Sequence, residues 1–322
     1  MAISTLCHPE RSSVAAKSKD PYRLRSIVFG ALIFFVSTAA FCQGRIECSS
    51  VASKILKRDV PYCVLLPKSY DTAGSTSKFP VLYFLHGLGD NQQSLINMGA
   101  WNLINDLRQQ NKIGDFLIAT PQGWGSFYIN SADGRTRYSD FFLDEFLPFI
   151  EHKYRARTDR AGRAISGISM GGYGAFRFAF AYPQKFSAVS AESAALFPDS
   201  PKVLDQAMQS GAPRAKLFGS VFGTPINPQH WTANSPFALA KQNAATISRL
   251  AISFNCGDQD GYRFNEGAAA LDRQLTAEKI SHAFKLYPGE HSLDYFLAHI
   301  EELMEFHSRE FARHPAAVSA GK

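Results

Sequence analysis

The hydrophobic positions of the chain form short apolar runs that alternate with longer amphipathic segments. Several of the runs are β-branched or aromatic and apolar on both faces, and each of the last five is followed within two residues by Gly, Pro or Ser. Such runs predict central strands of a parallel sheet that is covered by helices on either side. The expected strands are Tyr62–Leu66, Val81–Leu85, Phe116–Thr120, Ala164–Ser166, Ala188–Ala191, Leu250–Asn255 and Ala283–Tyr287.

The amphipathic segments between these runs predict helices. In the first of them, phenylalanines recur at helical spacing. The expected helices are Asp140–Tyr154, Met170–Ala181, Glu266–Glu278 and Leu293–Phe311. The stretch Leu196–Ala245 is rich in Pro, Ser and Gln and has no clear strand, so we expect a small helical lid that passes over the sheet. The whole pattern predicts an α/β fold with a mostly parallel central sheet, helices on both faces and a lid-like excursion.

Composition limits the classes of partner. The chain has 322 residues, 45% hydrophobic and 19% charged, which is ordinary for a globular enzyme of one large domain. Of the net charge of +6, half lies in residues 1–44, which hold five basic and two acidic residues. The remainder is close to balance, so composition gives no case for a nucleic-acid partner.

The N-terminal segment has the organisation of a secretory signal. Arg23 and Arg25 precede the apolar stretch Ile27–Val36, and small residues follow it. We expect residues 1–44 to be a signal peptide cleaved after Ala40 or Gly44, with an uncleaved membrane anchor as the alternative. The mature protein would then be periplasmic or secreted, without stable membrane association.

Export changes the interpretation of the cysteines. Cys48 and Cys63 flank two expected short strands, and an oxidising compartment would permit a disulfide between them. Two buried free thiols are the alternative, and Cys256 would remain unpaired. No Cys/His spacing typical of a zinc site occurs in the sequence.

A glycine-rich segment follows the expected strand Ala164–Ser166. It reads Gly167-Ile168-Ser169-Met170-Gly171, which fits the G-x-S-x-G pattern of a nucleophilic serine on a sharp strand-to-helix turn. Glycines allow the strand and helix to approach closely, and amides at the start of the helix point at a developing oxyanion. The pattern alone is common by chance, but the flanking strand and helix make Ser169 a candidate nucleophile.

A serine nucleophile needs a base, and the base needs a carboxylate that orients it. His291 lies in a loop directly after the last expected strand, where its imidazole could reach the serine. The loop after the preceding strand offers two carboxylates, Asp258 and Asp260. The residues themselves do not separate these two candidates.

A further loop follows the strand Val81–Leu85 and reads His86-Gly87-Leu88-Gly89-Asp90. Enzymes with a serine on this kind of turn place a second oxyanion-binding amide in that loop. We expect His86 to hold the loop in place rather than to act as a base.

Taken together, these segments resemble the putative-esterase family. This family includes esterase D and S-formylglutathione hydrolases, feruloyl and tributyrin esterases, and the mycobacterial mycolyltransferases. The similarity covers roughly residues 48–310. The segments that carry it are Tyr62–Pro67, Leu85–Leu88, Pro121–Gly123, Arg163–Phe186, Cys256–Asp260 and Gly289–His291.

The resemblance implies the α/β-hydrolase fold. We expect this domain to span residues 45–314 and residues 315–322 to form a frayed tail. It also implies that Asp260 is the acid of the triad and that the backbone amides of Leu88 and Met170 bind the oxyanion. No metal or organic cofactor is implied. The chain has His86 where S-formylglutathione hydrolases commonly carry Ser, which together with export favours a general or plant-polymer esterase.

The expected function is therefore hydrolysis of carboxylic esters with small acyl or feruloyl-type groups through an acyl-enzyme on Ser169. The substrate would be a small or polymer-linked ester, and Trp124, Tyr128 and the excursion Leu196–Ala245 are candidates for lining its pocket. An acyltransferase of the mycolyltransferase type and an S-formylglutathione hydrolase are alternatives. A non-catalytic binding module is a weaker one, because all three triad positions are filled. The sequence does not reveal the oligomeric state.

Overall fold

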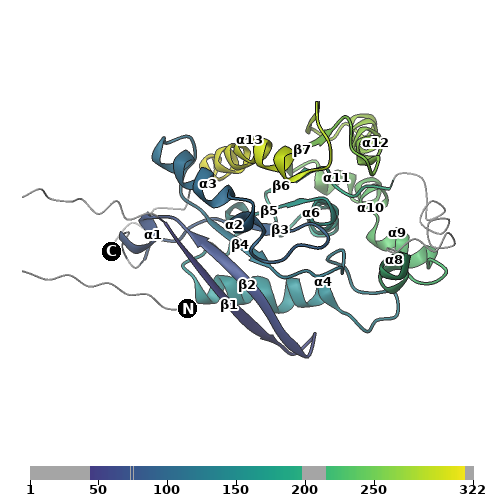
Figure 1. Cartoon of the computed structure of the whole chain (residues 1–322), viewed down its shortest axis with the longest axis horizontal. Coiled ribbons are helices and arrows are strands. Elements are labelled where there is room, and N and C mark those ends of the chain that lie inside the picture. Colours follow the sequence, from purple (N-terminus) through teal and green to yellow (C-terminus); the bar gives the residue numbers. More distant parts are fainter. Residues whose placement is uncertain (1–43, 73, 75, 198–214, 316–322) are drawn as a thin grey trace, which may run out of the picture. The chain divides into compact units, whose positions relative to one another are not determined.

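The described part of the chain is built on an eight-stranded sheet. The computed structural model describes residues 44–72, 74, 76–197 and 215–315, which belong to a compact unit that starts at Cys42. The expected signal segment and the tail from 316 lie outside these residues, except for Gly44. Along the sheet the strands are ordered β1-β2-β4-β3-β5-β6-β7-β8 (Figure 1). Their bounds are β1 Arg45–Ser53, β2 Arg58–Leu66, β3 Val81–Leu85, β4 Leu117–Pro121, β5 Arg163–Ile168, β6 Ala188–Glu192, β7 Ala251–Gly257 and β8 Ala283–Tyr287.

The sheet is mostly parallel, as the apolar runs predicted. Every neighbouring pair from β4 to β8 is parallel, whereas β1 pairs antiparallel with β2, and β2 antiparallel with β4. All seven strands with predicted bounds are present, with small shifts at their ends. The predictions gave no bounds for β1, an edge strand with several exposed polar residues and therefore a weak apolar pattern.

Helices cover both faces of the sheet. Their bounds are α1 Ser69–Thr72, α2 Ser94–Asn97, α3 Ala100–Gln109, α4 Tyr138–Asp140, α5 Leu147–Lys153, α6 Met170–Ala181, α8 Ala215–Phe222, α9 Pro228–Asn234, α10 Pro236–Gln242, α11 Ala244–Ile247, α12 Phe264–Ala277 and α13 Leu293–Arg313, with a π-helix η1 Phe141–Phe146 and a 3₁₀ turn η2 Arg160–Gly162. Helices α3 and α13 bury their apolar sides on one face, around Ile104 and Ile300. On the other face α5, α6 and η1 form a core rich in phenylalanine.

The helix predicted over Asp140–Tyr154 is interrupted in the structure. A short α4 leads into the π-helix η1, and α5 follows with Pro148 in its first turn. Proline has no amide hydrogen and cannot donate to the carbonyl four residues earlier, so regular α-helical bonding fails at this point. The phenylalanines Phe142 and Phe146 nevertheless stay fully buried, as their spacing predicted.

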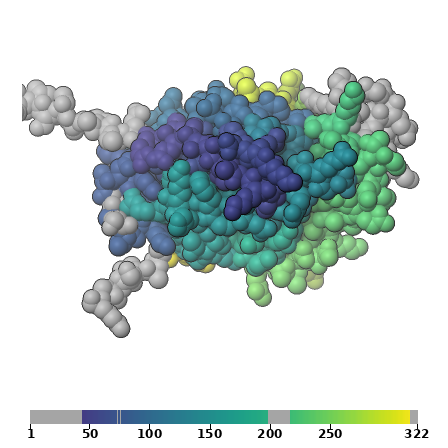
Figure 2. Space-filling model, turned by 90° about the horizontal axis from the view of Figure 1, so that it is seen from below, coloured from purple at the N-terminus to yellow at the C-terminus, as the bar shows by residue number. Residues whose placement is uncertain are grey.

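The turn between β1 and β2 is fastened to η1 by Glu145. The Ser53 hydroxyl donates to Glu145 Oε2 at 2.5 Å, and the amides of Lys54 and Ile55 donate to Oε1 at 3.0 and 3.2 Å. Figure 2 shows this N-terminal hairpin, in purple and blue, lying against the teal part of the chain. The hairpin is thus held by side-chain bonds as well as by its pairing in the sheet.

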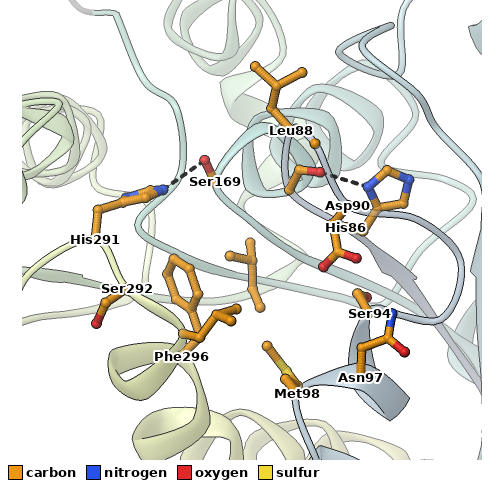
Figure 3. A pocket seen from close by; sticks show the side chains of 14 residues that line it. His86, Leu88, Asp90, Ser94, Asn97, Met98, Ser169, His291, Ser292 and Phe296 are labelled. Carbon is orange, nitrogen blue, oxygen red and sulfur yellow. Dashed lines mark hydrogen bonds between the residues drawn. The ribbon is translucent and has the colours of Figure 1, made fainter.

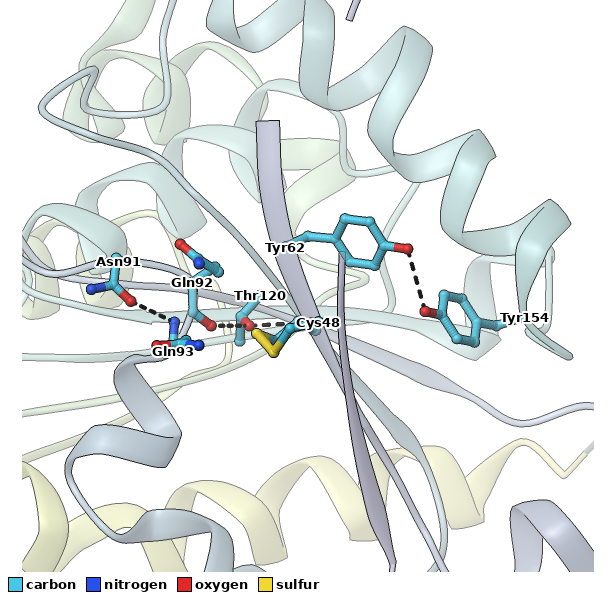
Figure 4. Close-up of a disulfide and its surroundings, with 8 residues drawn as sticks. Cys48, Tyr62, Asn91, Gln92, Gln93, Thr120 and Tyr154 are labelled. Carbon is cyan, nitrogen blue, oxygen red and sulfur yellow. Dashed lines mark hydrogen bonds between the residues drawn. A yellow bond between two sulfur atoms is a disulfide. The ribbon is translucent and has the colours of Figure 1, made fainter. Parts of the chain in front are cut away.

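Cys48 and Cys63 form a disulfide between β1 and β2, the pair expected from the sequence (Figure 4). The two cysteines face each other in the register of the antiparallel pair. Beside them the buried Thr120 on β4 donates to the Gln92 carbonyl at 2.5 Å. Cys256 is a buried free cysteine.

Among the described residues, no helix has the length and apolar character that a membrane crossing requires.

Candidate active site

Ser169 lies on the turn between β5 and α6 in a strained backbone conformation. Its φ is 56° and its ψ is −117°, a region that L-residues rarely adopt and that costs about 1–3 kcal/mol. Backbone bonds hold the turn in place. The Ser169 amide donates to the Glu192 carbonyl at 3.0 Å, and the Ser169 carbonyl accepts from Ala195 at 2.9 Å. The conformation leaves the hydroxyl free to point away from the helix, as the G-x-S-x-G pattern predicted.

The glycines of this turn are required by close backbone contacts. A Cβ on Gly171 would lie 1.9 Å from the carbonyl oxygen of Leu85, and one on Gly167 would lie 2.3 Å from the Gly171 carbonyl carbon. Either clash is far inside van der Waals contact with backbone that cannot rotate away. The start of α6 is therefore packed directly on the end of β3, where the loop with Leu88 begins.

His291 lies between β8 and α13, with its imidazole facing Ser169. The Ser169 hydroxyl donates to His291 Nε2 at 3.0 Å (Figure 3). The imidazole is enclosed by the rings of Tyr262, Phe264 and Phe296, with centroids at 4.9, 5.4 and 5.2 Å in edge-on contact. These rings restrict the rotation of the imidazole and leave its Nε2 facing the hydroxyl.

Asp260 holds the opposite side of the imidazole. His291 Nδ1 donates to Asp260 Oδ2 at 2.7 Å, and the Tyr262 amide donates to Oδ1 at 2.9 Å. Asp260 is 5% exposed. Burial raises the pKa of its carboxyl, but the hydrogen bond and charge of His291 and the amides of Tyr262 and Phe264 outweigh burial, so that the pKa is lowered. An ionised Asp260 fixes the tautomer in which Nε2 can accept a proton.

Asp258, the other carboxylate that the sequence left open, has a different position. It is exposed, and its Oδ1 accepts a hydrogen bond from the Gly289 amide at 3.1 Å. Gly289 lies two residues before His291 in the same loop. Asp258 therefore braces the backbone of the histidine loop and does not contact the imidazole in the structure.

His86 is enclosed beneath the loop with Leu88. Its Nδ1 donates to the Gly87 carbonyl at 2.7 Å, and its Nε2 accepts from the Gly123 amide at 2.8 Å. Burial lowers the pKa of the imidazole, which favours the neutral form that these two bonds require. His86 connects two loops, which agrees with the structural role expected for it.

A cavity of about 400 Å³ opens in front of Ser169 and His291 (Figure 3). A Cβ on Gly87 would lie 3.6 Å from Ser169 Cβ, so the loop with Leu88 borders the nucleophile directly. The described residues that line the cavity are His86, Gly87, Leu88, Gly89, Asp90, Ser94, Asn97, Met98, Ile168, Ser169, His291, Ser292, Leu293 and Phe296. Within the described part of the chain, no cluster of three or more His, Cys, Asp or Glu could hold a metal ion.

Two of the residues expected in the substrate pocket lie elsewhere. Tyr128 is 0% exposed, and its hydroxyl donates to the His86 carbonyl at 2.9 Å. The expectation of substrate contact is therefore wrong for Tyr128. Its ring is buried in the core and packs against Gly174. Trp124 lines a different cavity of about 310 Å³, together with Arg58 and Leu217.

The excursion over Leu196–Ala245 is helical in its described part, but that part does not line the cavity at Ser169. Helix α8 instead borders the cavity that contains Trp124. Residues 198–214 lie outside the described residues. The expected contribution of the excursion to the pocket is thus not found among α8 to α11.

The residues opposite His291 were not predicted from the sequence. Asp90 ends the loop with Leu88, and Ser94, Asn97 and Met98 follow it in and beside α2. Phe296 comes from the first turn of α13. Helix α2 is a single turn, too short for a periodic pattern to indicate it. The one available signal was that this segment directly follows an expected oxyanion loop.

Comparison with known proteins places the chain among esterases. The family model described as "Putative esterase" matches residues 53–307. Esterase Rv1288 of Mycobacterium tuberculosis is 35% identical over 171 residues, which are 51% of this chain and 36% of that protein. The chain thus spans about a third of the length of this curated relative. An acetyl esterase of Caldicellulosiruptor saccharolyticus is 25% identical over 264 residues, covering 80% of this chain and 96% of that enzyme.

Solved structures give the same picture of the fold. A ferulic acid esterase is similar with a TM-score of 0.71 and 26% identity, covering 84% of this chain and 99% of that one. An S-formylglutathione hydrolase from Staphylococcus aureus is similar with a TM-score of 0.68 and 20% identity, covering 83% and 99%. The chain therefore has the α/β-hydrolase fold that the resemblance implied, built on the mostly parallel sheet that its apolar runs predicted.

Proposed function

The chain belongs to the putative esterase family, and from this premise and the geometry of the site we propose that it is a serine hydrolase of carboxylic esters. We also propose, from its N-terminal segment and its disulfide, that it is exported. The observation that carries the proposal is the unbroken series of hydrogen bonds from Ser169 through His291 to Asp260. This series lies at a strained turn and faces a cavity large enough for a small ester.

In the proposed mechanism, His291 takes the proton of the Ser169 hydroxyl as its oxygen attacks the ester carbonyl. Asp260 stabilises the imidazolium that forms and holds its orientation. The backbone amides of Leu88 and Met170 would bind the oxyanion of the tetrahedral intermediate. His291 then protonates the leaving alcohol, and water releases the acyl group from Ser169 by the same route in reverse.

Export is the second part of the proposal. Its support is the predicted signal segment of residues 1–44 together with the disulfide between Cys48 and Cys63. Disulfides persist in the periplasm and outside the cell and are rare in the reducing cytosol. Residues 45–314 would then form the mature esterase domain.

Replacement of Ser169 by Ala tests the central claim. We expect S169A to lose roughly 10⁴- to 10⁶-fold in kcat towards p-nitrophenyl butyrate, because the nucleophile is removed. The variant should also lose labelling by a fluorophosphonate probe. Ser248, whose hydroxyl caps the end of α11 by bonding to Ala245, provides the matched control S248A. Full activity of S169A would refute the proposal.

A further inference from the structure

A second cavity lies between the start of β2, the loop after β4 and helix α8. Its volume is about 310 Å³, at the lower end of the range for small-molecule pockets in proteins. Among the described residues, it has no lining residue in common with the cavity at Ser169. Its lining combines arginines with apolar side chains. Ester hydrolysis at Ser169 gives this cavity no role.

Arg58, the first residue of β2, brings a fixed positive charge to the second cavity. Its guanidinium lies over the ring of Trp124, with 3.3 Å between Cζ and the ring centroid. Stacking fixes the plane of the guanidinium and leaves its N–H groups pointing outward in that plane. Within the described part of the chain, Arg58 makes no hydrogen bond or ion pair. Burial lowers the pKa of the guanidinium, because the charge is partly removed from water without a carboxylate beside it.

The loop that carries Trp124 is held in one conformation. Trp124, Phe127 and Tyr128 all have positive φ, of 47°, 51° and 60°, which non-glycine residues adopt only when their surroundings enforce it. The Trp124 amide donates to Gln122 Oε1 at 3.0 Å, and the neighbouring Gly123 amide is bonded to a buried imidazole. The indole and the guanidinium on it are therefore in place before any ligand arrives, which lowers the entropic cost of binding.

The charges of the lining leave one cation unbalanced. Asp133 accepts the Ser131 hydroxyl at 2.6 Å and the Arg135 amide at 3.0 Å, and its carboxylate lies 3.5 Å from Arg135 Nε. Asp133 and Arg135 thus offset each other within one turn. Arg58 is the remaining charge among the described lining residues, so a ligand with a single negative charge would balance the cavity.

The apolar part of the lining says more about the ligand. Ile129, Leu217 and Val221 line the same cavity as the guanidinium. A carboxylate matches the planar fork of an arginine with two parallel hydrogen bonds, and an apolar skeleton attached to it would cover these three side chains. A small bare anion would leave the apolar surface in water, and a neutral ligand would leave the charge of Arg58 without a partner.

We propose that the second cavity binds an organic monocarboxylate with an apolar body. Arg58 would hold the carboxylate, and Ile129, Leu217 and Val221 would contact the body beside the indole of Trp124. The cavity at Ser169 offers no such site, because its described lining includes Asp90 and no Lys or Arg. The proposal does not depend on the esterase function.

The indole N–H signals in the ¹H–¹⁵N NMR spectrum test the proposal. The chain has three tryptophans, and W124F identifies the signal of Trp124. We expect 4-phenylbutanoate to shift this signal with a Kd below about 1 mM and to leave the other two in place. Its neutral amide, 4-phenylbutanamide, and acetate, which lacks the apolar body, should each bind at least about 10-fold more weakly. Phenyl phosphate, which is mostly a dianion at pH 7.5, should also bind more weakly.

Substitutions of Arg58 then connect binding to the guanidinium. R58M keeps an apolar stem on Trp124 and removes the charge, so the affinity for 4-phenylbutanoate should fall about 10- to 100-fold. R58K keeps the charge without the planar fork and should give an intermediate affinity. R309M, which removes an exposed arginine of α13 outside both cavities, is the matched control and should bind normally. All three variants should keep the kcat/KM of the unmodified protein for p-nitrophenyl butyrate.

Four results would overturn the proposal. They are equal binding of the amide and the carboxylate, equal binding of acetate, tighter binding of phenyl phosphate, and undiminished affinity in both R58M and R58K. The dispersion of each variant's spectrum shows that it is folded, so a loss of binding by unfolding is recognised. Failure of the esterase function has a separate signature, which is retained activity in S169A.

Discussion

Asp258 and Asp260 are two residues apart on one loop, and their environments differ in every respect. Asp260 is buried and bonded to His291 Nδ1, whereas Asp258 is exposed and bonded to the Gly289 amide. One carboxylate faces the imidazole and the other faces the backbone of the histidine loop. Asp260 and Asp258 are chemically the same group. Their positions alone decide that Asp260 orients the base and that Asp258 braces the loop.

Paired substitutions separate these two roles. We expect D260N to lower kcat by about 10⁴-fold, because an amide cannot fix the required tautomer or stabilise the imidazolium. D258N keeps an oxygen for the Gly289 amide, so its effect on kcat should stay within a few fold. Steady-state kinetics on p-nitrophenyl butyrate measure both. A larger loss in D258N would contradict the assignment of Asp260.

At the scale of elements, β1 depends on connections beyond its pairing with β2. It lies at the edge of the sheet, and several of its side chains are exposed. The disulfide from Cys48 to Cys63 and the bonds of Glu145 to the hairpin turn are two such connections, and the ion pair of Arg45 with Asp71 in α1 is a third. The closed loop spans 15 residues in sequence, so the bond restricts the unfolded chain substantially.

Removal of the disulfide should therefore destabilise the protein. We expect the double variant C48S/C63S to lose about 3 kcal/mol of unfolding free energy, which corresponds to a fall in Tm of roughly 6–12 °C for a domain of this size. Calorimetry with and without a reductant measures the effect. C256S, which lacks the buried free thiol, is the control and should keep the response to the reductant. A reductant that leaves the Tm of the unmodified protein unchanged would contradict the expectation.

At the scale of the whole molecule, one buried carboxyl couples folding to pH. Glu192 ends β6 and is 1% exposed, and its carboxyl oxygens have no hydrogen-bond partner among the described residues. Burial, together with the charge of Glu302, raises the pKa of Glu192 well above its ordinary value. The folded protein therefore keeps a proton that the unfolded chain releases near pH 4.3.

The sign of this coupling gives a prediction. Between about pH 4.3 and the raised pKa, the folded state binds one more proton at Glu192, so the free energy of unfolding falls by about 1.4 kcal/mol per pH unit. E192Q should lack this slope, and its stability relative to the unmodified protein should grow from pH 5 to pH 8. Urea unfolding at several pH values measures it. E266Q on the exposed surface of α12 is the control, and parallel curves for E192Q would contradict the prediction.

The sequence predicted the sheet and the elements that carry Ser169, His291 and Asp260, because strong apolar runs and fixed turn chemistry specify these parts locally. It did not predict α2 or the break at Pro148, since a single turn and a π-helix leave no clear period. Tyr128 was misplaced for a related reason. An aromatic residue in a loop looks the same in a sequence whether it faces a ligand or fills the core, and only tertiary packing decides.

The contact between Gly171 and the end of β3 limits which parts of the site can change in sequence. It fixes the nucleophile and the oxyanion loop to each other through backbone atoms, without any exchangeable side chain. Asp90, Ser94 and Asn97, which line the cavity, lie just beyond this contact, in a short stretch that ends where α3 starts at Ala100. Substitutions in that stretch would change the lining of the cavity while the backbone contact, and with it the position of Ser169 beside the loop with Leu88, stays the same.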